Sequence, residues 1–341
     1  MGDILILGGT AWFGRTLAER ALTAGHRVTC LARGSRQAPP DGCRFVPSDR
    51  DQPDAYADVT DTQWDLVVEI AWQPGMVQRA LDALAARARG WVMISSCSVY
   101  ADHDRPGADE TAALLPAASG EHVDLEEYGG AKVACEQLTA AATDGRAVLA
   151  RAGLIGGDGD LSDRTGYWPG RFALAGSGPV LVPADGSGSV QIIDVRDLAD
   201  FVLLVGLAGR SGPVNVVGQR TSLADTLRLA SEAAVTAGYP AAQQIPAEGS
   251  FLQDRRVNPW AGPRSLPLWL PDQGYAGFGA HSDRLSLDWG LTRRPLADTL
   301  SGALQYEIRQ GLDRPRRAGL TREEELDLIG QLAATGAGAG T

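Results

Sequence analysis

Residues 3–14 read DILILGGTAWFG, and this stretch decides the fold of the chain. Residues 4–7 are uniformly apolar, which is typical of a strand buried on both faces of a parallel sheet. A glycine-rich turn follows, and residues 17–22 then repeat apolar side chains at helical spacing. This order places backbone N–H groups and a helix N-terminus where a pyrophosphate binds. We therefore expect a cofactor, rather than a tight turn without a ligand, against Gly8, Thr10, Ala11, Trp12, Phe13 and Gly14.

The alternation of strand and helix continues along the first half of the chain. Apolar strand-like segments occur at residues 27–31, 44–46, 65–70, 91–95 and 147–150. Helical patterns occupy residues 77–89, which we expect to end at Gly90, and residues 125–142. Strands that alternate with helices predict an α/β fold with a doubly wound parallel sheet, which binds ligands at the carboxyl ends of its strands. We expect residues 1–152 to form a dinucleotide-binding domain, to which the chain returns near residues 190–217.

The alternation of strands and helices ends after residue 152. Residues 153–189 and 218–330 are expected to form a smaller, irregular substrate-binding lobe with the C-terminal helices. Residues 251–282 are rich in Pro, Gly and aromatic side chains, which favours packing or a pocket wall over a flexible linker. Residues 335–341 contain only Gly, Ala and Thr and predict a disordered tail.

Composition excludes several classes of protein. The 341 residues carry 31 Lys and Arg against 42 Asp and Glu, a formal net charge of −11. An acidic chain lacks the basic face that nucleic acid requires, so we expect no nucleic-acid partner. No apolar stretch approaches the roughly 18 residues of a membrane helix, and no basic signal-peptide region begins the chain. We expect a cytoplasmic protein that acts on a small molecule and has no membrane partner.

The residues that could hold a metal ion do not fit a known spacing. The 4 cysteines lie far apart and indicate free thiols. Asp158, Asp160 and Asp163 share one loop, but the glycine and the terminal glutamate of a calcium loop are misplaced. We expect a solvated loop and no metal.

The end of the second strand bears on the choice of cofactor. An acidic residue at this place binds a ribose 2′-hydroxyl, whereas arginine accommodates a 2′-phosphate. Ala32 is not acidic, and Arg33 and Arg36 are available. The residues favour NADP(H), with NAD(H) as the alternative; in a chain this rich in arginine, two solvated arginines are the competing interpretation.

A tyrosine and a lysine stand four residues apart. Tyr128 and Lys132 share one helix face at this spacing, and an ammonium beside a phenol stabilises the phenolate that acid–base catalysis needs. Lys132 is the one lysine among the 31 basic residues, and chance would place it four residues after a tyrosine in about 2% of cases. Ser96 follows the strand at 91–95, where a hydroxyl can hydrogen-bond a substrate carbonyl or satisfy its own turn. We expect Ser96, Tyr128 and Lys132 to be catalytic.

Over roughly residues 3–300 the chain resembles the extended, epimerase/dehydratase-like branch of the short-chain dehydrogenase/reductase superfamily. The resemblance is carried by the turn at 8–14, the string from Ser96 to Tyr100, the Tyr128/Lys132 pair, Asp49 and residues 191–199. It implies a Rossmann-type sheet and hydride transfer to or from a nicotinamide. Tyr128 would be the general acid/base, Lys132 would hold the nicotinamide ribose, and Ser96 would orient the substrate oxygen. Asp49 and Ala71 would contact the dinucleotide, and a homodimer is expected.

The chain departs from the family pattern at three places. Ala11 replaces the middle glycine of the turn and brings a Cβ toward the pyrophosphate. Cys97 and Ser98 replace the Asp-Glu pair of the sugar dehydratases, so we expect no dehydration. Leu154 replaces an asparagine that contacts the sugar diphosphate in many epimerases, which indicates a more apolar substrate. The expected substrate pocket comprises Trp72, Cys97, Ser98, Leu154, Tyr167, Trp168 and Gln191.

These residues predict an NADP(H)-dependent oxidoreductase, a ketoreductase that acts on a hydrophobic small molecule such as a secondary metabolite. Two alternatives remain open: a nucleotide-sugar epimerase that retains NAD, and a non-catalytic dinucleotide-binding protein.

Overall fold

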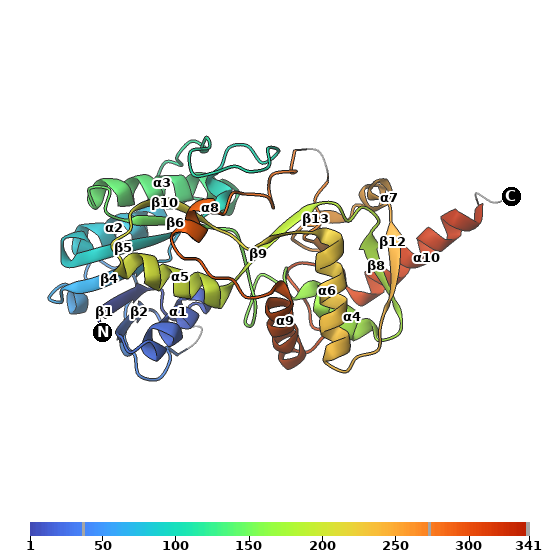
Figure 1. Cartoon of the computed structure of the whole chain (residues 1–341), viewed down its shortest axis with the longest axis horizontal. Coiled ribbons are helices and arrows are strands. Elements are labelled where there is room, and N and C mark those ends of the chain that lie inside the picture. Colours follow the sequence, from blue (N-terminus) through green and yellow to red (C-terminus); the bar gives the residue numbers. More distant parts are fainter. Residues whose placement is uncertain (36–37, 272–273, 339–341) are drawn as a thin grey trace.

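A computed structural model describes residues 1–35, 38–271 and 274–338. The chain forms two lobes side by side, with the N-terminus on one and the C-terminus at the far end of the other (Figure 1). We call the part built around the large sheet the sheet lobe and the other part the second lobe. No helix in the described ranges has the length and apolar character needed to cross a membrane.

Seven parallel strands form the large sheet, in the order β10-β6-β5-β4-β1-β2-β3. This confirms the predicted doubly wound α/β fold. Its strands are β1 (Asp3–Leu7), β2 (Arg27–Ala32), β3 (Arg44–Pro47), β4 (Trp64–Glu69), β5 (Ala88–Ser96), β6 (Val148–Ala152) and β10 (Gly212–Val216). The helices beside it are α1 (Trp12–Thr23), α2 (Pro74–Leu84), α3 (Tyr128–Ala142) and α5 (Val195–Leu207).

The strand β1 shows why its apolar run is continuous. Ile4 and Ile6 belong to the core shared with α1 and α5, whereas Leu5 and Leu7 belong to the core shared with α2. All four side chains are fully buried because helices cover both faces of the sheet. Leu7 pairs with Leu31 of β2 and with Glu69 of β4, so these strands end at one edge of the sheet.

Two glycines allow backbones to approach closely. Gly8 has a φ of +104°, which favours glycine, and a Cβ on Gly14 would collide with the Gly8 carbonyl oxygen. Gly90 was expected to end a helix, and this prediction is wrong. The helix α2 ends at Leu84 and Gly90 lies within β5, where a Cβ would come within 2.6 Å of the Gly206 carbonyl oxygen.

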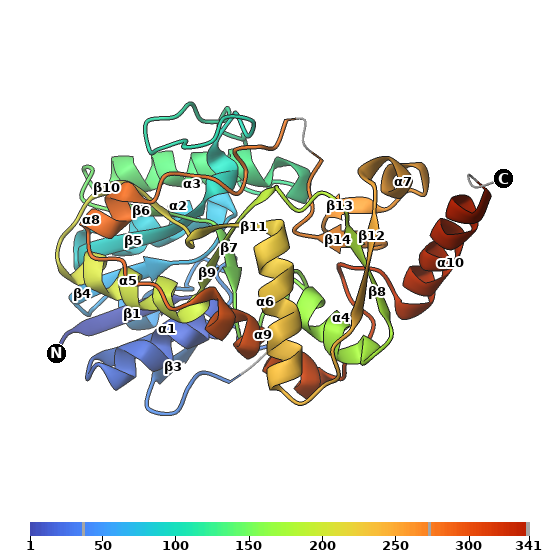
Figure 2. The same ribbon diagram turned by 45° about the vertical axis from the view of Figure 1, so that its right-hand side comes forward.

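The second lobe has its own hydrophobic core and smaller sheets, and a sheet in the order β11-β9-β7 lies between the lobes (Figure 2). The strands that lie outside the large sheet are β7 (Leu154–Gly156), β8 (Pro179–Pro183), β9 (Ser189–Asp194), β11 (Arg220–Ser222), β12 (Gln243–Ala247), β13 (Asn258–Trp260) and β14 (Ser265–Pro267). The remaining helices are α4 (Tyr167–Ala175), α6 (Leu223–Thr236), α7 (Gly249–Asp254), α8 (Arg284–Asp288), α9 (Leu296–Gln310) and α10 (Arg322–Gly338).

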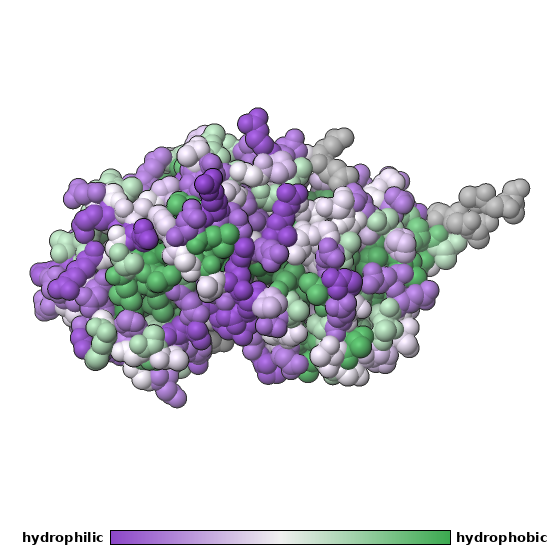
Figure 3. All heavy atoms as spheres, viewed as in Figure 1, coloured by the Kyte–Doolittle hydropathy of each residue, from purple (hydrophilic) through white to green (hydrophobic). Residues whose placement is uncertain are grey.

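Two expected boundaries shift. Helix α8 contacts β10, and Leu291 belongs to the core beneath α1 and α5, so this part of residues 218–330 packs on the sheet lobe. Helix α10 continues to Gly338, where a disordered tail was expected from residue 335; residues 339–341 lie outside the described residues. Figure 3 shows a mainly hydrophilic face, with hydrophobic side chains gathered over α5, which carries the exposed Leu204 and Leu207.

Candidate active site

Two cavities lie at the carboxyl edge of the large sheet. The larger, of about 810 Å³, adjoins the ends of β5 and β6 and is walled by both lobes; we call it the central cavity. The smaller, of about 390 Å³, adjoins the ends of β1 and β2 and the segment after β3; we call it the edge cavity. This is the edge where doubly wound sheets bind their ligands.

The expected catalytic residues all line the central cavity. They are Ser96, Tyr128 and Lys132, and the neighbouring Cys97, Ser98 and Leu154 line it as well. Ser96 ends β5, and its Oγ accepts a hydrogen bond from the Ser98 backbone N–H at 3.1 Å and donates to Ser98 Oγ at 3.1 Å. This serine therefore both stabilises its own turn and presents a hydroxyl to the cavity. Burial raises the pKa of the Cys97 thiol, which keeps it protonated.

Tyr128 begins α3, and Lys132 lies one turn further along it. The ammonium of Lys132 is 6.0 Å from the centre of the Tyr128 ring. Lys132 is only 3% exposed and donates hydrogen bonds to the backbone oxygens of Ile94 at 2.6 Å and Ala71 at 3.0 Å. The lysine thus ties α3 to the ends of β4 and β5 as well as placing a charge beside the phenol.

The two glycines after Tyr128 lie in the first turn of α3, against protein backbone. A Cβ on Gly129 would collide with the Ser98 carbonyl oxygen, and one on Gly130 would come within 2.9 Å of the Pro116 carbonyl oxygen. Gly129 therefore lets α3 pack close to the turn that carries Ser98, and Gly130 lets it pack close to the segment around Pro116.

The edge cavity brings together most of the residues expected to bind the dinucleotide. It is lined by Gly8, Thr10, Ala11, Arg33, Asp49 and Ala71. Ala11 has φ −75° and ψ 157°, ordinary extended backbone, so its conformation does not require glycine. Among the described residues that line the edge cavity, Asp49 is the acidic one. Arg33 is exposed just after the end of β2, and Arg36 lies outside the described residues. The helix α1 begins at Trp12, so its N-terminus faces this cavity, as pyrophosphate binding requires.

A buried ion pair beneath the edge cavity was not predicted. The guanidinium of Arg50 binds the carboxylate of Glu69 through both Nη atoms, one of them at 2.8 Å, and donates to the Tyr56 hydroxyl at 2.9 Å. Glu69 also accepts the Ala71 backbone N–H at 2.8 Å. This network fixes the end of β4 and the segment after it. Neither residue matched a motif, so the sequence offered no signal for the pair.

Three aromatic residues differ from their expected places. Tyr167 and Trp168 were expected in the substrate pocket, but both are fully buried in the core of the second lobe, where Trp168 Nε1 donates to the Pro267 carbonyl oxygen at 2.7 Å. Helix α4 packs against α6 and α9, which turns these rings away from the cavity. Trp72 lines the edge cavity, and its ring centre is 5.6 Å from that of Tyr128.

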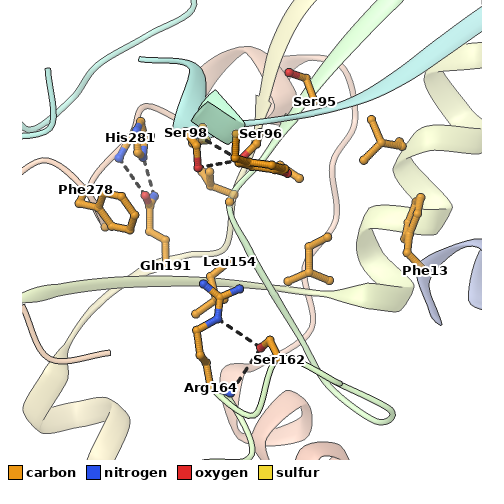
Figure 4. A pocket seen from close by; sticks show the side chains of 18 of the residues that line it. Phe13, Ser95, Ser96, Ser98, Leu154, Ser162, Arg164, Gln191, Phe278 and His281 are labelled. Atoms are coloured by element: carbon orange, nitrogen blue, oxygen red, sulfur yellow. Dashed lines mark hydrogen bonds between the residues drawn. The ribbon is translucent and has the colours of Figure 1, made fainter. Parts of the chain in front are cut away.

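Gln191 lines the central cavity as expected, but its amide is already occupied. The amide oxygen accepts the His281 backbone N–H at 2.8 Å, and the amide nitrogen donates to the His281 carbonyl oxygen at 3.0 Å (Figure 4). Gln191 thus joins β9 to the segment around residue 281. Its effect on a substrate would come through the shape of the wall.

Several lining residues escaped the sequence predictions. They are Arg164, Trp260, Phe278 and His281, all of which follow the expected dinucleotide-binding domain at residues 1–152. The aromatic content of residues 251–282 did indicate a pocket wall, and Trp260 and Phe278 form part of it, with ring centres 4.8 Å apart. Burial lowers the pKa of His281 to about 4, so the imidazole is neutral near pH 7.

Two of the three acidic residues of the loop are buried and bound to protein groups, which corrects the expectation of a solvated loop for Asp160 and Asp163 but not for the exposed Asp158. Asp160 and Asp163 are 2% and 4% exposed. Asp160 accepts hydrogen bonds from Ser162 and Thr165, whereas Asp158 and Asp163 pair with arginines of the second lobe. Trp12 Nε1 donates to the Asp158 carbonyl oxygen at 2.7 Å, so Trp12 connects the glycine-rich turn to this loop.

A family model described as the NAD dependent epimerase/dehydratase family matches residues 4–218, which include the glycine-rich turn, Tyr128 and Lys132. The chain belongs to this family. The match confirms the predicted relationship to the extended short-chain dehydrogenases/reductases and makes the chain an enzyme of that branch.

Individual relatives of this epimerase/dehydratase family member are distant. The chain is 28% identical over 256 residues to a dTDP-6-deoxy-L-talose 4-dehydrogenase (NAD(P)(+)) of Kitasatospora kifunensis, covering 66% of this chain and 76% of the relative. The UDP-N-acetylglucosamine 4-epimerase of Bacillus cereus superposes with a TM-score of 0.64 at 16% identity, covering 91% and 100% of the two chains. The UDP-glucuronic acid 4-epimerase of Bacillus cereus, solved with NAD, gives 0.62 at 14% identity, covering 90% and 99%. The two superpositions support the fold alone.

Proposed function

We propose that this family member is an NADP(H)-dependent oxidoreductase that interconverts a ketone and the matching secondary alcohol on a hydrophobic small molecule. The observation that carries the proposal is the meeting of Ser96, Tyr128 and Lys132 around one cavity whose wall is otherwise largely apolar. A net oxidoreduction also matches the dehydrogenase named among the relatives.

The edge cavity fits the dinucleotide. The N-terminus of α1 and the open glycine-rich turn suit a pyrophosphate, and Thr10, Asp49 and Ala71 line the adjoining wall. Arg33 supplies a cation for a 2′-phosphate, and its neighbours at the end of β2 supply no carboxylate for a 2′-hydroxyl. The bound nicotinamide supplies or accepts the hydride.

The chain's own residues handle the proton and the orientation of the substrate. Ser96 Oγ turns its one proton from Ser98 Oγ to the ketone oxygen, and Tyr128 Oη gives its proton to that oxygen as the alcohol forms. The Lys132 ammonium stabilises the phenolate that remains. The apolar wall, including Phe13 and Leu154, excludes water from the reacting atoms.

Turnover of NADPH tests the proposal. The purified protein is mixed with NADPH and a panel of aryl and alkyl ketones, and with NADP+ and the matching alcohols, and cofactor absorbance is followed. We expect net consumption of NADPH with at least one hydrophobic ketone. Tightly held NAD that co-purifies, without net consumption of added cofactor, would favour the epimerase. Binding of cofactor without turnover of any ketone or nucleotide sugar would favour the non-catalytic protein.

A further inference from the structure

Arg164 brings unused hydrogen-bond donors into the central cavity. Its Nε donates to Ser162 Oγ at 3.2 Å, but neither Nη atom has an acceptor within the described part of the chain. In Figure 4 the Arg164 side chain extends from its loop toward the part of the cavity wall that holds Leu154. A partly buried cation with free donors is suited to an anion that arrives with the substrate.

The carboxylate that shares the cavity wall with Arg164 does not serve as its partner. Asp160 lines the cavity too, but its oxygens accept hydrogen bonds from Ser162 at 2.8 and 3.0 Å and from Thr165 at 2.6 and 3.3 Å. Burial lowers the pKa of Arg164, and the nearby Asp160 and Tyr128 oppose this shift. A guanidinium holds its proton more strongly than any other side chain, so Arg164 remains charged.

The guanidinium packs against a tryptophan ring, and the loop that carries it is anchored to the second lobe. Its carbon lies 5.4 Å from the centre of the Trp260 ring, and Phe278 packs edge-on against that ring. Trp260 has a φ of +64°, a conformation that aromatic residues rarely adopt, and its backbone N–H donates to the Trp269 carbonyl oxygen at 2.9 Å. On the loop itself, Asp163 accepts the Arg317 backbone N–H at 2.8 Å. Because the cation is already fixed, binding an anion costs little additional side-chain entropy.

The other basic residues of the cavity wall are not equivalent. Two of the three donors of Lys132 are used by backbone oxygens, and the neutral His281 carries no charge near pH 7. Among the described residues that line the cavity, Arg164 is therefore the cation with both Nη groups free to donate.

We infer that Arg164 binds a carboxylate of the substrate, so that the substrate is a hydrophobic keto acid or the matching hydroxy acid. The inference rests on the proposed function for the reacting ketone, but not for the carboxylate. The planar guanidinium matches the two oxygens of a carboxylate. A sugar diphosphate would bring more negative charge than this one cation neutralises, whereas an apolar wall suits the rest of a hydrophobic acid.

Ligand binding tests this site without any turnover. The protein saturated with NADP+ is titrated by calorimetry with benzoate, 3-phenylpropionate and 4-phenylbutyrate, and with their primary amides. We expect at least one carboxylate to bind about tenfold or more tightly than its amide, the size expected for charge-assisted hydrogen bonds. Arg164→Met should remove this preference, and Arg164→Lys should keep part of it. Arg210→Met is the matched control, because Arg210 also lies over an indole, that of Trp289 at 5.7 Å, outside the cavity.

Three results would overturn the inference: carboxylates that bind no better than their amides, a preference that survives in Arg164→Met with its fold intact by circular dichroism, or no binding of any carboxylate. Arg164-dependent binding of UDP with no binding of carboxylates would assign the guanidinium to a diphosphate instead.

Turnover separates this inference from the proposed reaction. If keto acids and their methyl esters are reduced equally well, the reaction stands and the carboxylate site fails. If carboxylates bind through Arg164 and no ketone is reduced, the carboxylate site stands and the reaction fails.

Discussion

The ammonium of Lys132 donates a hydrogen bond to the carbonyl oxygen of Ile94 at 2.6 Å, and thereby fixes α3 against the end of β5. A second donor reaches the Ala71 carbonyl oxygen at 3.0 Å. An ammonium has three donors, so one remains for the cofactor ribose or the phenol of Tyr128. The ammonium of Lys132 therefore fixes the helix and keeps one donor for its proposed catalytic role.

Lys132→Arg should lower turnover strongly, by about 100-fold, because a planar guanidinium cannot direct three donors from one atom. The site is only 3% exposed, so the larger side chain should also lower the melting temperature by a few degrees. Steady-state kinetics with a thermal melt checks both effects. Turnover equal to that of the parent enzyme would show that the lone lysine has no catalytic role.

Arg33 should set the preference for NADPH. Neutralising it in Arg33→Gln should weaken NADPH binding about tenfold, or about 1.4 kcal/mol, and leave NADH binding nearly unchanged. Fluorescence titration with both cofactors gives the ratio. Arg89→Gln is a suitable control, because Arg89 is exposed near the start of β5, at the opposite edge of the sheet. Equal losses for both cofactors in Arg33→Gln would argue against 2′-phosphate recognition.

His281 should make the protein less stable in acid. Burial and the neighbouring His103 lower its pKa from 6.5 to about 4 in the folded state. The unfolded chain therefore binds a proton that the folded chain does not, and stability falls as the pH drops from 6.5 toward 4, by up to about 3 kcal/mol. Urea unfolding across this pH range should show a smaller slope in His281→Gln. The exposed His122 gives the control His122→Gln, whose slope should match the parent; an unchanged slope in His281→Gln would contradict this account.

Much of the fold and part of the site follow from local patterns. The stretch at residues 3–14 predicted β1 and α1 because burial on both faces leaves a continuous apolar run before the turn. The spacing of Tyr128 and Lys132 placed both on one helix face, and the sheet then brought Ser96 beside them. These predictions depend on neighbours in sequence and on the rule that parallel strands end at one edge.

The remaining features depend on contacts between distant segments. Aromatic character alone could not tell that Tyr167 and Trp168 fill the second core, because pocket walls and cores use the same side chains. Gly90 resembled a helix end, since nothing nearby in sequence reveals the Gly206 carbonyl oxygen that it faces. Arg164 was one arginine in a chain rich in arginine, and its free donors became visible only when Asp160 proved to be occupied.

Tyr128→Phe tests the central claim most directly, because it removes one oxygen and leaves the ring that packs against Trp72. Turnover of the ketone and the dissociation constant of NADPH are measured for the parent and the variant, with circular dichroism to confirm the fold. The account predicts that turnover falls about 100-fold or more while NADPH binding stays nearly unchanged. Full turnover in Tyr128→Phe would contradict the assignment of Tyr128 as the general acid/base.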